Sequence, residues 1–171
     1  MEKNSLLLLL ENKKDKMTNL IGEFECKIDI KGRFMLPVGL KKQLPPEVND
    51  RFVINRGFEK CLTLYPQNVW KKISDEVNQL NLYNKKNRDF VRYFYRGASE
   101  MLMDSASRML LPKQLMEYAD IKKDLVLFAY SDRIEIWAKE SYSSLITDEP
   151  ENFSALAEEV MGRKDNTENT D

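Results

Sequence analysis

Two arginines follow aspartates at the same spacing in this chain. Arg33 lies four residues after Asp29, and Arg108 lies four residues after Asp104. An arginine at an exposed turn can reach a phosphate oxygen or the edge of a guanine base. Alternatively, each aspartate pairs with its arginine and only fixes the shape of the turn, as turn aspartates often do. The spacing leaves both interpretations open, although the occurrence of two copies favours a binding role.

A longer pattern repeats around these pairs. Leu36-Pro37 follows the first arginine and Leu111-Pro112 follows the second at the same distance. In both copies an apolar stretch precedes the aspartate, and the proline suits the first position of a helix, where its missing N–H costs nothing. The pattern predicts a strand, a turn, a second strand and a short helix, twice. A unit too small to bury its own apolar face packs against its copy, so we expect two halves that share one core.

Alternation and turn residues define the elements of the first half. Phe24, Cys26 and Ile28 alternate with charged residues, which predicts a strand that ends near Asp29. Gly32 then allows a turn with positive φ. The elements expected after this turn are a strand at 34–36, a helix at 38–44 with Val38, Leu40 and Leu44 on its apolar face, a hairpin of strands 52–54 and 61–65, and a helix from Pro66 to Leu80.

The second half follows the same order, with strands expected at 99–103, 125–128 and 133–137 and a helix at 113–118. Another helix is expected around Tyr142. The predicted organisation is a disordered or weakly ordered N-terminal extension (1–20), a first repeat (22–80), a basic amphipathic linker helix (81–97), a second repeat (98–146), a C-terminal helix (150–162) with Phe153, Leu156, Ala157 and Val160 on its apolar face, and a disordered tail (163–171).

The linker between the repeats is rich in basic residues. On a helix, its cations and its apolar residues fall on opposite sides. The phosphate backbone of a nucleic acid would suit such a stripe, although a basic stripe is also common as a solvated face. The cations on one side are Lys85, Arg88, Arg92 and Arg96, with Lys86 nearby, and the apolar residues on the other are Phe90, Val91 and Phe94.

The composition argues against most enzyme chemistry. The chain has no histidine, which removes the usual general base near neutral pH and the commonest metal ligand. Cys26 and Cys61 lack the paired spacing of a zinc site, so we expect buried, reduced thiols and neither a metal nor a cofactor. Trp70 and Trp137 are expected in the core rather than as stacking platforms. No catalytic constellation and no phosphate-binding glycine loop is recognisable.

The net charge and the hydropathy of the chain limit the kinds of partner to expect. With 27 basic and 28 acidic residues the net charge is −1, so attraction to a polyanion must come from local patches. The apolar run at 6–10 is shorter than the ~7–15 residues of a signal peptide core, and no segment is long enough to span a bilayer. Met17 is a possible alternative start. We therefore expect a cytoplasmic protein with no membrane partner and no small-molecule substrate.

The motifs resemble those of the MraZ family, bacterial transcriptional regulators with two AbrB/SpoVT-type DNA-binding units. The resemblance runs from about Thr18 to Gly162 and rests on the two Asp-x-x-x-Arg…Pro motifs and on Arg96-Gly-Ala before the second. It implies an α+β, β-rich fold, a swapped-hairpin β-barrel whose two tandem repeats interleave, with short peripheral helices. It also implies ring-shaped homo-oligomers on the nucleoid that bind direct promoter repeats upstream of the division and cell-wall gene cluster.

Carried over residue by residue, the resemblance assigns DNA contact to Arg33 and Arg108, with Lys31 beside the first. Asp29, Gly32 and Asp104 are the turn-fixing residues. The chain departs from the family where Ser107 replaces a glycine. If that position needs positive φ, serine is strained there by roughly 1 kcal/mol, and the second turn would differ in shape or bind DNA less well. We therefore rank Arg33 before Arg108.

Two other classes of function compete with DNA binding. The chain could be an oligomeric scaffold that recruits a protein partner through the 6–10 segment or the 153–160 helix. An enzyme on a related barrel is disfavoured because no histidine and no acid/base pair of carboxylates stands out. A DNA shift experiment separates the scaffold from the regulator.

Overall fold

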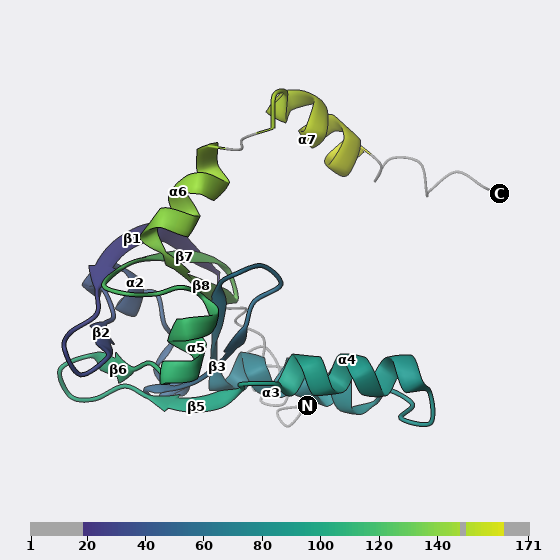
Figure 1. The fold of residues 1–171 in the computed structure, drawn as a ribbon, viewed down its shortest axis with the longest axis horizontal. Helices are drawn as coiled ribbons and strands as arrows, with labels where there is room; N and C mark the ends of the chain where they lie inside the picture. Colours follow the sequence, from purple (N-terminus) through teal and green to yellow (C-terminus); the bar gives the residue numbers. More distant parts are fainter. Residues whose placement is uncertain (1–18, 148–149, 163–171) are drawn as a thin grey trace, which may run out of the picture. The chain divides into compact units, whose positions relative to one another are not determined.

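The computed structural model of the chain describes residues 19–147 and 150–162 (Figure 1). The predicted tail at 163–171, the apolar run at 6–10, Met17 and nearly all of the predicted N-terminal extension lie outside the described residues. The chain forms two compact units, the first ending at Lys139 and the second beginning at Glu140.

Antiparallel strands and short helices make up the first unit. They occur in the order β1 (Leu20–Lys27), β2 (Arg33–Met35), α2 (Val38–Lys41), a 3-10 turn (Pro46–Val48), β3 (Arg51–Arg56), β4 (Leu62–Pro66), α3 (Gln67–Asn78), α4 (Lys85–Tyr95), β5 (Ser99–Leu102), β6 (Arg108–Leu110), α5 (Lys113–Tyr118), β7 (Asp124–Ser131) and β8 (Arg133–Ala138).

The two halves of the chain interleave in the sheets. Six strands pair in the order β1-β7-β8-β4-β3-β5, all antiparallel, and β2 pairs with β6 in a separate ribbon. The first strand of each half thus pairs with the hairpin of the other, β1 with β7 and β5 with β3. β1 and β5 are the edges of the larger sheet, and each runs through its turn into the ribbon. This exchange of strands confirms the predicted α+β, β-rich fold of two interleaved repeats.

One hydrophobic core lies between the halves. The largest fully buried side chains include Phe34 of β2, Met109 of β6, Phe52 of β3 and Leu127 of β7, each at most 1% exposed. Burying one such side chain contributes roughly 1.5–3 kcal/mol. Because both repeats supply these residues, the prediction of a shared core is confirmed.

The short helices differ in detail from the prediction. α2 ends at Lys41, and the chain forms a 3-10 turn after Pro45 that the sequence pattern did not indicate. Val38 was expected on an apolar face but is 66% exposed, because a helix of one turn buries a single position, which Leu40 occupies. α4 ends at Tyr95, so Arg96 lies outside the helix, next to Gly97 at φ 81°.

The second unit contains most of α6 (Lys139–Thr147) and all of α7 (Phe153–Met161). The side chain of Asn152 caps α7 by accepting a hydrogen bond from the Ala155 N–H at 3.0 Å. No residue of α7 is buried. Among the described helices, none has the length and hydropathy needed to cross a bilayer.

Candidate nucleic-acid interface

The first Asp-Arg turn is closed by one carboxylate. Oδ1 of Asp29 accepts hydrogen bonds from the N–H groups of Lys31 and Arg33, both at 2.9 Å. Oδ2 accepts from Nε of Arg33 at 2.8 Å. These bonds, chiefly the one from the Arg33 N–H, lower the pKa of Asp29 below its usual value, so the carboxylate stays ionised at neutral pH. Asp29 therefore bonds to the main chain and to the arginine side chain on the other side of the turn.

The second turn has the same hydrogen bonds. Oδ1 of Asp104 accepts from the N–H groups of Ala106 and Arg108, and Oδ2 accepts from Nε of Arg108, all at 2.9 Å. The pKa of Asp104 is lowered for the same reason. The main-chain bond that closes the turn is also shared, with Ser107 N–H donating to the Asp104 carbonyl at 2.9 Å. The two turns therefore present their arginines in matching ways.

Ser107 adopts a positive φ, which strains a serine but would not strain a glycine. Its φ is 60°, against 82° for Gly32 in the first turn. The shape of the turn is nevertheless kept, so the expectation of a differently shaped second turn is wrong. A hydrogen bond from the first half of the chain offsets the strain of Ser107. Lys41 Nζ donates this bond to Ser107 Oγ at 2.7 Å. At the matching position of the second half stands Met116, whose sulfur lies 3.9 Å from where a Cβ on Gly32 would be.

The ribbon decides which way the arginines point. In its register Arg33 faces Leu110, Phe34 faces Met109 and Met35 faces Arg108. Phe34 and Met109 are buried in the core. Since successive side chains of a strand point to opposite faces, the other four residues share the outer face. That outer face comprises Arg33, Met35, Arg108 and Leu110, with the two arginines at diagonal corners.

The turns are also joined to each other across the ribbon. Leu36 N–H donates to the Ser107 carbonyl at 2.8 Å, and Leu111 N–H donates to the Gly32 carbonyl at 2.9 Å. These bonds extend the ribbon by one residue at each end and fix the turns relative to one another. The pair of arginines is thus held by one continuous hydrogen-bonded framework.

The sequence pattern suggested arginines at exposed turns, but each arginine lies at the base of its turn and is only partly exposed. Their side chains are 27% and 36% exposed for Arg33 and Arg108, because each lies against its aspartate. In the described part of the chain each ion pair uses Nε, and the terminal guanidinium nitrogens make no hydrogen bond. One guanidinium can therefore fix the turn and still offer donors to a ligand.

Apolar residues that sequence reasoning did not single out surround the arginines. Met35 is 55% exposed, Leu110 58%, and Ile30 at the first turn is fully exposed, as is typical of a surface that meets a partner. Lys31, next to Ile30, is also exposed. Strand alternation around Phe34 and Met109 is the signal that could have indicated Met35 and Leu110, whereas nothing in the sequence pattern points to Ile30.

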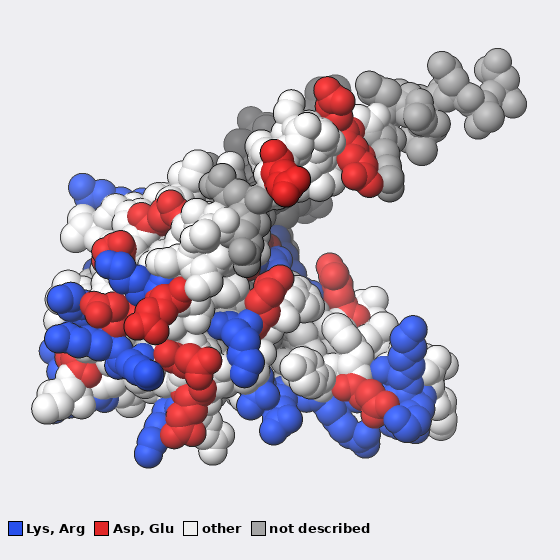
Figure 2. Space-filling view, turned by 45° about the horizontal axis from the view of Figure 1, so that its top comes forward, with Lys and Arg blue, Asp and Glu red and all other residues white. Residues whose placement is uncertain are grey.

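The cations of α4 are less available than the sequence suggested. Lys85 and Arg92 both pair with Asp89, the latter at 3.7 Å. Arg88 donates from one terminal nitrogen to the carbonyls of Leu82 and Tyr83 at 2.8 and 2.9 Å, which holds the loop before the helix. Figure 2 shows basic and acidic side chains intermixed over this face of the first unit. Ribbon and α4 lie at opposite ends of that unit (Figure 1).

The cysteines and tryptophans have structural surroundings. Burial raises the pKa of the Cys61 thiol to about 12, and the neighbouring carboxylates of Glu135 and Glu59 act in the same direction. These three residues bring ligand atoms within 4.8 Å of one another, but a thiol that stays protonated is a poor metal ligand. Cys26 is half-buried rather than buried. Trp137 is buried, and Trp70 stacks on Phe94 between α3 and α4.

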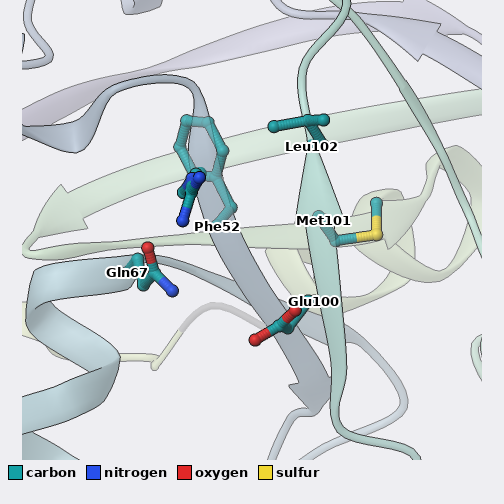
Figure 3. Close-up of a pocket in the computed structure, with 6 residues that line it drawn as sticks. Phe52, Gln67, Glu100, Met101 and Leu102 are labelled. Carbon is teal, nitrogen blue, oxygen red and sulfur yellow. The ribbon is translucent and has the colours of Figure 1, made fainter.

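A groove of about 400 Å³ lies beside β5 (Figure 3). Gln67 of α3 and Glu100 of β5 point into it from opposite sides. Its lining residues include a single carboxylate, so they offer no acid/base pair for catalysis. The residues that line the groove are Arg51, Phe52, Gln67, Glu100, Met101 and Leu102.

The two turns should respond differently to exchange of their third residue. Gly32→Ser places a side chain at positive φ, with Met116 rather than a lysine nearby, and should lower the free energy of unfolding by about 1 kcal/mol. Ser107→Gly relieves strain but loses the bond from Lys41, so the change should stay within about 0.5 kcal/mol. Urea unfolding measures both; equal losses would show that φ does not decide the difference.

Comparison with known proteins places the chain in a family. The family model described as "MraZ protein, putative antitoxin-like" matches residues 20–93 and 94–164. A protein of Christiangramia forsetii named "Transcriptional regulator MraZ" is 46% identical over 150 residues, which cover 87% of this chain and 97% of that protein. Proteins of the same name from Flavobacterium psychrophilum and Cytophaga hutchinsonii are 42% and 39% identical, covering 89% and 82% of this chain and 98% and 93% of their own lengths. This chain therefore belongs to the MraZ family.

Proposed function

We propose that the protein is a sequence-specific DNA-binding transcriptional regulator, and not an enzyme, that contacts DNA with the outer face of its β2–β6 ribbon. The observation that carries this proposal is the pair of arginines at diagonal corners of that face, each oriented by an aspartate. A two-stranded ribbon fits the major groove of B-DNA, where arginine is the commonest reader of guanine.

Each residue of the ribbon has a separate role in this proposal. Arg33 and Arg108 donate to guanine edges or phosphates, and the exposed Lys31 adds a phosphate contact. Asp29 and Asp104 hold the guanidinium groups in place before DNA arrives, which reduces the entropy lost on binding. Met35 and Leu110 lie between the arginines and contact the apolar edges of bases.

Several ribbons acting together compensate for the weak charge of the chain. With a net charge of −1, a single copy has little long-range attraction for DNA. A ring-shaped homo-oligomer that presents ribbons to successive direct repeats gains avidity, by about 10²–10⁴-fold when the geometry allows simultaneous contact. We assign the target to promoter repeats upstream of the division and cell-wall gene cluster, bound in the cytoplasm on the nucleoid.

The basic residues of the linker are the weaker candidates for DNA contact. Lys85 and Arg92 share Asp89, Arg88 is occupied by backbone carbonyls, and Arg96 lies beyond the helix. The helix also lies at the opposite end of the first unit from the ribbon (Figure 1). A DNA duplex that contacts both the ribbon and α4 has to run across the whole first unit.

Replacing Arg33 or Arg108 with alanine should weaken binding to the promoter fragment about 10-fold or more, because a bidentate contact to guanine contributes about 1–3 kcal/mol. Arg33→Lys should rescue little, since the ammonium lacks the planar fork. Lys122→Ala, an exposed lysine before β7, is the matched control for charge. Fluorescence anisotropy gives the affinities; unchanged binding with reduced thermal stability would leave the arginines a structural role alone.

Binding should also depend on thymine methyl groups if Met35, Leu110 and Ile30 face the bases. A promoter fragment synthesised with deoxyuridine in place of thymine loses these methyls while keeping its Watson–Crick pairing. We expect weaker binding of the deoxyuridine fragment by the parent protein and a smaller difference for Ile30→Ser, which matches Ser105 of the second turn. Equal affinities of the parent for both fragments would limit the ribbon to polar contacts.

The number of repeats should matter more than their individual quality. A fragment with several direct repeats should bind at least 100-fold more tightly than a fragment of equal length in which one repeat is kept and the others are scrambled, as expected for about 10²–10⁴ of avidity. Titrations of both fragments at the same salt concentration provide the comparison. Similar affinities would contradict the avidity argument while leaving DNA binding intact.

A further inference from the structure

Two of the described helices are amphipathic but contain no fully buried residue. No residue of α4 is fully buried, and Phe90 and Tyr93 are 46% and 59% exposed. No residue of α7 is buried either, with Phe153, Leu156 and Val160 at 73%, 40% and 62% exposure. Amphipathic helices gain most of their stability by packing the apolar face, so each of these faces is suited to a partner.

Contacts with α3 hold α4 in place on the first unit. Phe94 stacks on Trp70 of α3 with ring centroids 5.3 Å apart, and the Tyr95 hydroxyl donates to Asn78 of α3 at 3.0 Å. The side chain of Asn84 caps the start of α4. α3 and α4 therefore project together from the sheet (Figure 1). An ordered helix needs little rearrangement to receive a partner.

Between α4 and the β3–β4 loop lies a small aromatic groove, which includes Phe58, itself 90% exposed. Its volume of about 50 Å³ admits the end of a side chain, whereas small-molecule pockets measure roughly 300–1,000 Å³. Asn55 and Arg56 also line this groove. The groove therefore offers a docking partner mainly exposed aromatic surface, from Phe58, Phe90 and Tyr93.

The charges of the two helices are complementary. α4 carries four cations, Lys85, Lys86, Arg88 and Arg92, against the single anion Asp89. α7 carries Glu158 and Glu159 and no lysine or arginine within its bounds. A basic helix with exposed aromatic rings and an acidic helix with exposed aliphatic and aromatic residues fit one another in both respects.

We propose that α7 of one copy docks on α4 and the neighbouring groove of a second copy. The two surfaces differ, so the contact is head-to-tail, and such contacts generate rings when the rotation closes. This inference rests on the oligomer of the proposed function and supplies its interface, but it does not depend on how the ribbon meets DNA. It assigns the basic stripe of α4 to assembly and leaves DNA to the ribbon.

Charge exchange between two full-length variants tests this contact. One variant carries Lys86→Glu and Arg92→Glu on α4, and the other carries Glu158→Lys and Glu159→Lys on α7. Each variant alone faces like charges at every junction and should lose the parent's assembled mass in sedimentation velocity. An equimolar mixture that alternates the two variants restores opposite charges at every junction, normal helix on normal helix at one and reversed on reversed at the next, and should recover that mass.

Controls separate loss of the contact from loss of the fold. Lys122→Glu with Lys123→Glu reverses two exposed lysines before β7 and should leave assembly unchanged. Leu156→Asp should abolish assembly without any change on α4, because a carboxylate then sits in the apolar face of α7. Thermal unfolding by circular dichroism should show the first unit of every variant intact.

DNA binding distinguishes failure of this inference from failure of the proposed function. The α7 variants should bind a single-repeat fragment about as tightly as the parent, and the α4 variant should keep the parental salt dependence. If the α4 variant instead flattens the log–log salt slope by about 0.9 for each lost phosphate contact, α4 faces DNA and the inference is overturned. Parental assembly of either charge-reversed variant, a monomeric parent, or a mixture that fails to assemble also overturns it, whereas loss of DNA binding by the parent would contradict the proposed function instead.

Discussion

The pairing of Phe34 with Met109 is the contact on which the candidate interface depends. These residues face each other at the centre of a ribbon of three residues per strand, and both are buried in the common core. Because side chains alternate along a strand, burial of these two residues turns their neighbours on both strands to the outer face. A slip of the ribbon by one residue would turn the arginines into the core, where their charge could not be solvated. Apolar burial thereby orients a polar surface.

Interleaving makes this ribbon a property of the whole unit. β2 and β6 come from different halves, and so do the partners β1 and β7. A single half would leave Phe34 and its strand edges exposed to water, so neither half can build the arginine pair alone. In a fold of this kind the chain gains a composite surface at the cost of long-range contacts, which form late and slowly.

The sequence alone predicted what depends on local pattern and repetition. Alternation around Phe24 and the prolines at 37 and 112 located strands and helices, and the repeat indicated one core and two Asp-Arg turns. It could not show that Arg33 lies across from Leu110, because register depends on which strands pair. Nor could it show that Asp89 and two backbone carbonyls bind three of the four cations of α4, since i,i+4 pairing and loop closure compete with solvent at every charged position.

The difference between the two turns shows how a duplicated unit can diverge without losing its geometry. Gly32 has Met116 beside it, whereas Ser107 has Lys41, each neighbour coming from the opposite half. The strain of a serine at φ 60° is roughly 1 kcal/mol, and a hydrogen bond to a charged donor is of the same order. The exchange at 107 is thus tolerable because the interleaved fold brings a lysine to it. The same hydrogen bonds around Asp104 as around Asp29 then keep Arg108 in the same orientation as Arg33, so the serine alone gives no reason to rank the two arginines differently.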